Sequence, residues 1–349
     1  MQQVQRQATV MFSSLLGEAA PLDFLVAASK DTDAEVRKLV CIALQSLAHR
    51  ANPDWLIPLL GDREAEVRRY AEEALIPYGN RVPLEAVLHA LVERGVDFED
   101  PLAQVLGSFK EDFPRSVLER LAESQGEVAA VILGELGTAA PTDLLDALLA
   151  VPFSESTRPM RFEALLAAKK LKSSQLAPRL AAIMRDEQDF SRFSAAAALG
   201  AIGDPVYMPE ILALLPIAKP LDFSDVADGL SGFGEQMPVD EMVEFILAYP
   251  SDGNEDIGDL LDALRFAGKH TPYEFLVSYV QDADRDPEAR GAAAKALASF
   301  AGAGLTTTQQ YDFALHVLIE LLQSEGDPLF RHSVAYCLGL IKDPIVLEP

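Results

Sequence analysis

The chain has little of what marks an exported or membrane-bound protein. Among its 349 residues there are two cysteines, Cys41 and Cys337, and no Cys-x-x-Cys pair. A disulfide framework is therefore excluded, and we expect a reducing compartment, the cytoplasm. No basic head followed by a long apolar run opens the chain, and no apolar stretch reaches membrane-spanning length. We therefore predict neither a secretory signal nor a membrane partner.

Positive charge is also scarce. There are 29 Lys and Arg residues against 54 Asp and Glu residues, so the formal net charge is −25. A chain with this balance repels DNA, RNA and anionic membrane surfaces, because all of them carry charge of the same sign. We therefore predict no nucleic-acid partner. The excess of acid either maintains solubility or attracts a basic partner.

Motifs for catalysis and for metal binding are missing as well. The five histidines do not share a metal-ligand spacing, and neither cysteine stands beside one. The sequence contains no Walker-type phosphate loop and no Gly-x-Ser-x-Gly elbow. We predict no catalytic residue, no metal and no cofactor. Carboxylates are so frequent that a catalytic acid among them would leave no signature in the sequence.

What the sequence does contain is a repeat. Residues 31–48 read DTDAEVRKLVCIALQSLA, and residues 62–79 read DREAEVRRYAEEALIPYG. From Val36 the apolar or small positions follow one face of a helix. The same template fits further stretches that begin at Met160, Ser191, Ala289 and Phe330.

A second series of apolar segments lies between these helices, and several of its members open with proline near the first turn. Both series recur about every thirty residues. One helical pair cannot bury its apolar face alone, so this period predicts a stack of pairs. We predict an all-α fold, a right-handed α-α superhelix of about ten to eleven two-helix repeats. It should form one continuous domain over residues 1–349, with both cysteines buried.

Charged residues recur at fixed places in the template. The residue after its first position is Arg in every copy, and four copies have Asp six residues earlier. These pairs are Asp31 and Arg37, Asp62 and Arg68, Asp186 and Arg192, and Asp284 and Arg290. Asp before a helix can cap its free N–H groups, and Arg can reach a carboxylate of its own or the next repeat. We predict a structural ladder of ion pairs.

The Asp-x-Asp-x-x-Val-Arg and Ala-Leu positions resemble HEAT repeats, in particular the short HEAT-like repeats of phycobilisome lyases and many bacterial scaffold proteins. The similarity is clearest in DTDAEVRKLVCIAL, DREAEVRRYAEEAL and DRDPEARGAAAKAL, and it extends over nearly the whole chain. The resemblance implies a curved solenoid whose second helices line the concave side. It is specific for the fold and says little about function.

Charge singles out an irregular acidic middle at about residues 193–264, which holds fourteen acids and one base, Lys219. The acids that we expect to face a partner are Glu210, Asp222, Asp225, Asp228, Asp240, Glu241 and Glu244. If Phe223 and Phe233 are exposed among them, the region suits a basic, partly apolar peptide. Otherwise both rings belong to the core and the acids form a solvated face. Trp55, the only tryptophan, is either a binding anchor on the concave side or a core residue.

Three functions follow from these features. The first is a non-enzymatic scaffold that binds a protein partner, with a basic segment, on a concave acidic surface. The second, implied by the resemblance alone, is a bilin lyase-like factor acting on a chromophore of a partner protein. Visible absorbance that co-purifies with the protein would separate these two. The third is a HEAT-like DNA glycosylase, which the net charge and the single tryptophan disfavour.

Overall fold

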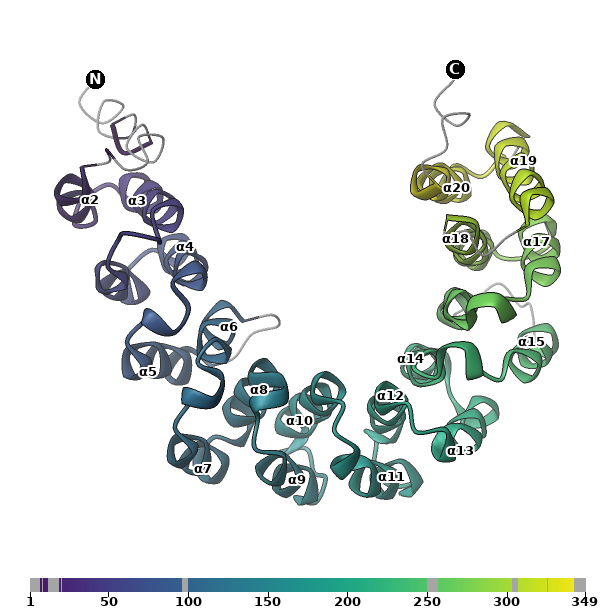
Figure 1. The fold of residues 1–349 in the computed structure, drawn as a ribbon, viewed down its shortest axis with the longest axis horizontal. Helices are drawn as coiled ribbons and strands as arrows, with labels where there is room; N and C mark the ends of the chain where they lie inside the picture. Colours follow the sequence, from purple (N-terminus) through teal and green to yellow (C-terminus); the bar gives the residue numbers. More distant parts are fainter. Residues whose placement is uncertain are drawn as a thin grey trace. The chain divides into compact units, whose positions relative to one another are not determined.

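The computed structural model describes residues 7, 9–11, 19, 21–95, 100–249, 257–302, 307–324 and 326–341. Within these ranges the chain forms α-helices and short 3-10 helices, and it contains no β-strand (Figure 1). The predicted all-α repeat solenoid is confirmed. By its contacts the chain divides into two compact units, Met1–Leu171 and Lys172–Pro349. The handedness and the continuity over residues 1–349 stay predictions.

The first unit is built from α-helices joined or replaced by 3-10 helices. In chain order its elements are α2 (Leu22–Ala28), α3 (Ala34–Ser46), η2 (Pro53–Trp55), η3 (Ile57–Gly61), α4 (Ala65–Leu75), η4 (Ile76–Arg81), α5 (Leu84–Arg94), α6 (Pro101–Gly107), η5 (Lys110–Asp112), α7 (Arg115–Ser124), α8 (Gly126–Leu136), η6 (Gly137–Ala139), α9 (Thr142–Ala150) and α10 (Arg158–Leu171).

The second unit follows the same scheme. Its elements are η7 (Ser174–Leu176), α11 (Ala177–Arg185), α12 (Arg192–Ile202), η8 (Pro205–Tyr207), α13 (Met208–Leu212), η9 (Leu215–Ile217), η10 (Pro220–Asp222), α14 (Phe223–Ser231), η11 (Gly234–Gln236), α15 (Val239–Ala248), α16 (Gly258–Ala263), η12 (Leu264–His270), α17 (Tyr273–Gln281), α18 (Pro287–Gly302), α19 (Thr308–Ser324) and α20 (Pro328–Ile341).

Each unit consists of two rows of helices. The main row is α3, α4, α6, α8 and α10 in the first unit, and α12, α14, α16, α18 and α20 in the second. The flanking row is α2, η3, α5, α7 and α9 in the first unit, and α11, α13, α15, α17 and α19 in the second. Each flanking element packs on the main-row helix that follows it, so every layer is one helical pair (Figure 1).

Each unit bends toward its main row. Successive main-row helices pack closely along their lengths, whereas successive flanking elements touch at few points (Figure 1). Within each unit the main row therefore lies on the inner side of the bend. The expectation, taken from the resemblance, that the second helices line the concave side is wrong within either unit. The helices that carry the Arg positions line it instead.

Local sequence explains why the main-row helices form. In α3 the side chain of Asp33 accepts the backbone N–H of Glu35 at 3.0 Å and caps the first turn. Val36, Val40 and Leu44 recur at helical spacing and are buried. The periodic apolar face and the acidic cap that the sequence displays are thus the features that position this helix.

The main row of the second unit has an unusually close contact at two glycines. A Cβ atom added to Gly200 of α12 would overlap the carbonyl oxygen of Gly229 in α14, so the two backbones touch there. Gly203 ends α12 in the left-handed region with a φ of 77°, where a residue without Cβ is favoured. Small residues therefore determine how closely these two layers stack.

Proline makes the flanking row less regular than the main row. The segment NPDWLIPLL, expected as one helix, forms η2 and η3, each with a proline in its first turn. Proline has no N–H to donate and restricts the residue before it, so continuous α-helical bonding cannot cross these positions. Trp55 therefore lies half-buried at the end of a 3-10 turn. Helix α13, with Pro209 near its start, is similarly short.

Candidate functional site

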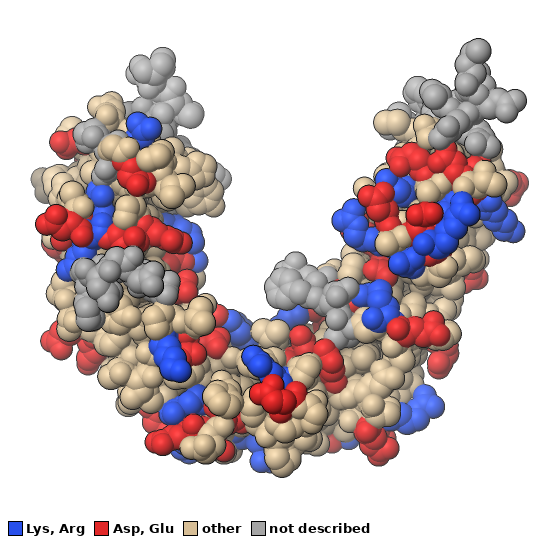
Figure 2. Space-filling view, turned by 180° about the vertical axis from the view of Figure 1, so that it is seen from behind, with Lys and Arg blue, Asp and Glu red and all other residues tan. Residues whose placement is uncertain are grey.

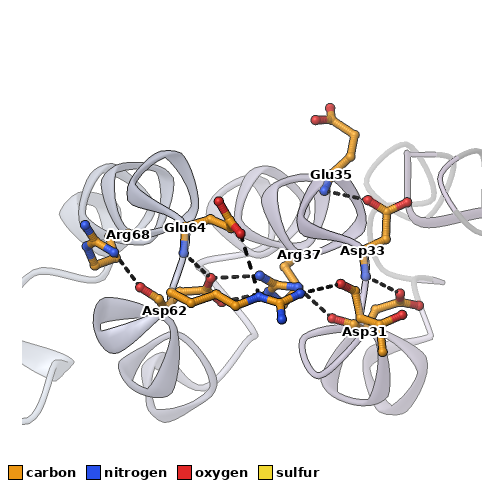
Figure 3. Close-up of polar contacts among 9 residues, drawn as sticks. Asp31, Asp33, Glu35, Arg37, Asp62, Glu64 and Arg68 are labelled. Carbon is orange, nitrogen blue, oxygen red and sulfur yellow. Dashed lines mark hydrogen bonds and ion pairs between the residues drawn. The ribbon is translucent and has the colours of Figure 1, made fainter.

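The first step of the predicted ladder is a buried ion pair between neighbouring layers. Arg37 donates from Nε and Nη2 to the two carboxylate oxygens of Asp62, at 2.7 and 2.8 Å. The two side chains are only 7% and 8% exposed. Arg37 Nη1 also donates to the backbone carbonyl of Asp31 at 2.8 Å, so one guanidinium joins two layers (Figure 3). The hydrogen bonds from Arg37 hold the pKa of Asp62 below its usual value.

The other ladder arginines have different surroundings. Arg68 donates from Nη1 to the carbonyl oxygen of Asp62 at 2.6 Å. Arg290 donates to the carbonyl of Val280 at 3.0 Å and lies 4.0 Å from the ring centre of Phe330 in the next layer. In the second unit, Arg192 Nε has no hydrogen-bond partner among the described residues, and its guanidinium lies over Phe193.

The remaining ladder acids act locally rather than across layers. Asp186 accepts the N–H of Gln188 at 2.9 Å, and exposed Asp284 precedes Asp286, which accepts two N–H groups at the start of α18. Within the described ranges the repeating motif thus links layers through the bidentate rung at Arg37 and through Arg290 over Phe330, and it makes turn contacts at Arg68 and Asp186.

The acids proposed to face a partner come from both rows of the second unit. Glu210, Asp222 and Asp225 are among those that bond within the protein. Glu210 on α13 holds Arg185 at 2.6 and 2.7 Å, Asp225 on α14 accepts from Ser194 Oγ at 2.6 Å, and Asp222 accepts the N–H of Lys219. The exposed acids are Asp228 on α14 and Asp240, Glu241 and Glu244 on α15.

These acids do not form a single wall. Asp222, Asp225 and Asp228 belong to the main row, whereas Glu210 and the three acids of α15 belong to the flanking row. On the face shown in Figure 2, acidic and basic side chains are interspersed. Three of the fourteen acids of the middle, Asp252, Glu255 and Asp256, lie outside the described residues.

Phe223 and Phe233 are core residues, so the second of the two alternatives for them, burial, is the correct one. Phe223 is fully buried and packs edge-on against Phe245 and Tyr249, with ring centres 5.8 and 5.4 Å away. Phe233 is also buried. The described part of this region has exposed apolar side chains elsewhere, at Val206, Ile217, Leu221 and Leu247. Leu221, in the turn before α14, is 92% exposed, more than the other three.

Leu221 stands at the edge of a groove along the main row of the second unit. The groove has a volume of about 390 Å³, and its lining comes from the start of α14 and from α16 and α18. Three carboxylates line it, Asp259, Asp262 and Glu288, against one ammonium group, that of Lys295. Lys295 Nζ lies 3.2 Å from Asp262, while Asp259 and Glu288 are exposed.

Sequence reasoning did not assign this groove to the site. Asp259 and Asp262 were only part of the acidic middle, and Glu288 lies beyond its end. Glu288 is, however, the residue just before the first apolar position of its repeat, where Glu35 and Glu66 also stand. That recurring acid was the available signal, because it occupies the exposed first turn of main-row helices.

The flanking row has cavities of its own, because its elements spread apart. In the first unit a cavity of about 650 Å³ lies between η3, α4 and α5, and Arg68 contributes to its lining. In the second unit a cavity of about 450 Å³ lies between α17 and α19, beside the half-exposed ring of Phe313.

Other expected features can be placed individually. Burial raises the pKa of Cys41 and of Cys337 to about 12, so both thiols are unreactive at neutral pH. Among the residues that the structure describes, no group of three His, Cys, Asp or Glu side chains is arranged to hold a metal ion. None of the described helices combines the length and the apolar character that crossing a membrane requires.

The fold and the layer contacts define an α-helical repeat protein. Two family models match it, HEAT repeats over residues 2–110 and the PBS lyase HEAT-like repeat over residues 191–215. The HEAT-repeat resemblance is confirmed, since each unit contains one of the two matched stretches. No curated protein matches the chain.

Solved structures that match the chain include importin beta, Kap121p and an engineered protein. Importin beta has a TM-score of 0.53 at 14% identity, over 94% of this chain and 55% of that one. Kap121p has a TM-score of 0.42 at 16% identity, over 93% of this chain and 38% of that one. The engineered protein has a TM-score of 0.34 at 19% identity, over 97% and 94%. At such identities the likeness concerns the fold, and the chain spans about half of importin beta.

Proposed function

We propose that this protein is a non-enzymatic scaffold that binds a protein partner through a basic, partly apolar segment. The segment lies in the main-row groove of the second unit, between α14, α16 and α18. The observation that carries the proposal is the groove itself, with three carboxylates against one ammonium group and exposed Leu221 at its edge. A scaffold role also fits the extended surface of a repeat solenoid.

The charges of the groove select the chemistry of the segment. Glu288 is exposed and offers its carboxylate to a Lys or Arg side chain, and the exposed carboxylate of Asp259 adds negative charge to the same groove. Asp262 already receives Arg265 Nη1 at 3.0 Å and Lys295 at 3.2 Å, so it marks where a basic group is held. An apolar residue beside the basic one covers Leu221, which removes apolar surface from water.

The first measurement identifies the partner by affinity capture from native lysate and mass spectrometry. Binding kinetics are then compared for two charge reversals, a groove variant with Asp259→Lys and Glu288→Lys, and a control variant with Asp240→Lys and Glu241→Lys on α15. Long-range attraction raises the association rate and is screened above about 0.15 M salt. The groove variant should associate more slowly than the control.

Two results would contradict the proposal. If the α15 control slows association as much as the groove variant, attraction depends on total charge and not on the groove. If the purified protein carries visible absorbance that follows it through a sizing column, a chromophore-binding factor becomes the better description.

A further inference from the structure

Two arginines at the same repeat position, Arg37 and Arg68, have different partners. Arg37 donates two parallel hydrogen bonds to the Asp62 carboxylate, at 2.7 and 2.8 Å. Arg68 donates one, from Nη1 to the Asp62 carbonyl, and forms no ion pair with any residue that the structure describes (Figure 3). Its guanidinium therefore keeps N–H donors in the fork geometry that fits a carboxylate.

Arg68 opens onto the cavity of about 650 Å³ between η3, α4 and α5. Ile57 and Leu60 from η3 and Ala90 from α5 give this cavity apolar walls. Its volume lies in the range of protein ligand sites. An occupant with a carboxylate at one end and an apolar side chain beside it matches both parts of the lining.

Most other charges of the cavity are paired. The Asp62 carboxylate is held by Arg37, and Glu72, which is buried, lies 3.1 Å from Nε of Arg94. Arg68 is thus a half-buried charge of this cavity that lacks an ionic partner among the described residues.

Glu93 is the remaining acid of the cavity lining. Asp62 follows Arg37 by 25 residues, and the residue at the same distance after Arg68 is Glu93. Glu93 lies on α5 and not in a loop, its side chain is 71% exposed, and its carboxylate lies 3.7 Å from His89 Nε2. Because Glu93 sits on a helix, it does not pair with Arg68 in the way that Asp62 pairs with Arg37 one layer earlier.

We propose that Arg68 and this cavity bind an acidic side chain of a partner protein, with the apolar residue two positions earlier seated against Ile57 and Leu60. The chain supplies its own template for the acidic residue, since Asp62, which follows Leu60 and Gly61, presents its carboxylate to Arg37. The site lies in the first unit and stands independently of the groove proposed for a basic segment.

The test uses a capped tripeptide, acetyl-Leu-Gly-Asp-amide, and its isosteric control acetyl-Leu-Gly-Asn-amide. Each is titrated to millimolar concentration into the full chain labelled with ¹⁵N, and the Nε–Hε resonances of arginine are followed. The Asp peptide should move the Arg68 resonance and leave that of Arg37 in place. Because charge-assisted bonds are about twice as strong as neutral ones, the Asn peptide should bind at least about tenfold more weakly.

Matched variants separate the site from general charge. Arg68→Gln should abolish binding of the Asp peptide, whereas Arg69→Gln, an exposed neighbour that lies 3.5 Å from Glu73, should retain it. Glu93→Gln should tighten binding, since it removes a competing carboxylate.

The proposal is overturned by equal binding of the two peptides, by full binding to the Arg68→Gln variant, or by an Arg68 resonance that does not move. Both arginine variants should remain folded at the temperature of the titration, which their melting curves check, so a loss of binding cannot be assigned to unfolding. If acetyl-Leu-Gly-Asn with a free C-terminus binds as the Asp peptide does, the site accepts a terminal carboxylate and the assignment to a side chain is wrong.

Discussion

The junction of α3 with α4 and the junction of α12 with α14 stack the same repeat in two different ways. The first is tied by the buried Arg37–Asp62 pair and by Lys38, whose ammonium group lies 3.0 Å from Glu66. The second brings two backbones into contact at Gly200 and Gly229. Neighbouring layers can therefore be held together either by a buried ion pair or by close backbone packing at glycines. We expect the first junction to respond to loss of charge and the second to added side-chain volume.

The largest effect is expected from breaking the ion pair. Arg37→Ala leaves the Asp62 carboxylate buried without its counter-charge, which costs about 3–5 kcal/mol of unfolding free energy. Urea unfolding followed by circular dichroism measures this loss. A loss below about 1 kcal/mol would mean that water or another cation replaces Arg37 and that the pair is dispensable.

A smaller loss, about 1–3 kcal/mol, is expected when a methyl group is placed between the two backbones of the glycine junction. The variant is Gly200→Ala, and the matched control is Gly339→Ala at the equivalent position of α20, where an added Cβ meets nothing within 4 Å. Helix propensity alone favours alanine at both positions. The comparison fails if both variants gain stability equally.

Acid should weaken the ion-pair junction selectively. The pKa of Asp62 is lowered in the folded protein, so its contribution is complete above the ordinary Asp value of about 3.9 and is lost as pH falls through the folded value. The difference in unfolding free energy between the parent and Asp62→Asn should therefore shrink as pH falls below about 4. A difference that stays constant with pH would show that Asp62 acts through shape and not through charge.

The smallest effect is expected one layer further on. Arg68→Ala removes a single hydrogen bond to a carbonyl group, which contributes about 1 kcal/mol or less. Differential scanning calorimetry of this variant beside Arg37→Ala would measure how much the carboxylate adds to the same arginine position. If Arg68→Ala and Arg37→Ala lower the unfolding free energy equally, the ion pair of Arg37 with Asp62 adds nothing to stability beyond the single hydrogen bond of Arg68.

The sequence was sufficient to predict the layers, because a helix face and a thirty-residue period are local patterns. It also contained both members of the Arg37–Asp62 rung, at a spacing that recurs. The prolines of NPDWLIPLL were visible too, and their effect on the flanking row follows from their missing N–H groups.

The groove of the second unit could not be predicted in the same way. Leu221, Asp259 and Glu288 are far apart in sequence and meet only because α14, α16 and α18 are successive in the main row. The position of Phe223 stayed open between surface and core for a related reason. The direction of one side chain depends on the helix register, which places Phe223 against Phe245 and Tyr249.

The glycine junction also constrains how the chain can evolve. A stack of equal units can lengthen by duplicating one of them, and an ion pair survives duplication because each new copy brings both charges. A repeat inserted between α12 and α14 would pack against Gly200 on one side and Gly229 on the other. It would therefore need a glycine of its own at each of these two contacts. A copy with alanine at either place would push the neighbouring helices apart, so this junction locks the order of its two layers, whereas the ion-pair junction between α3 and α4 can be duplicated.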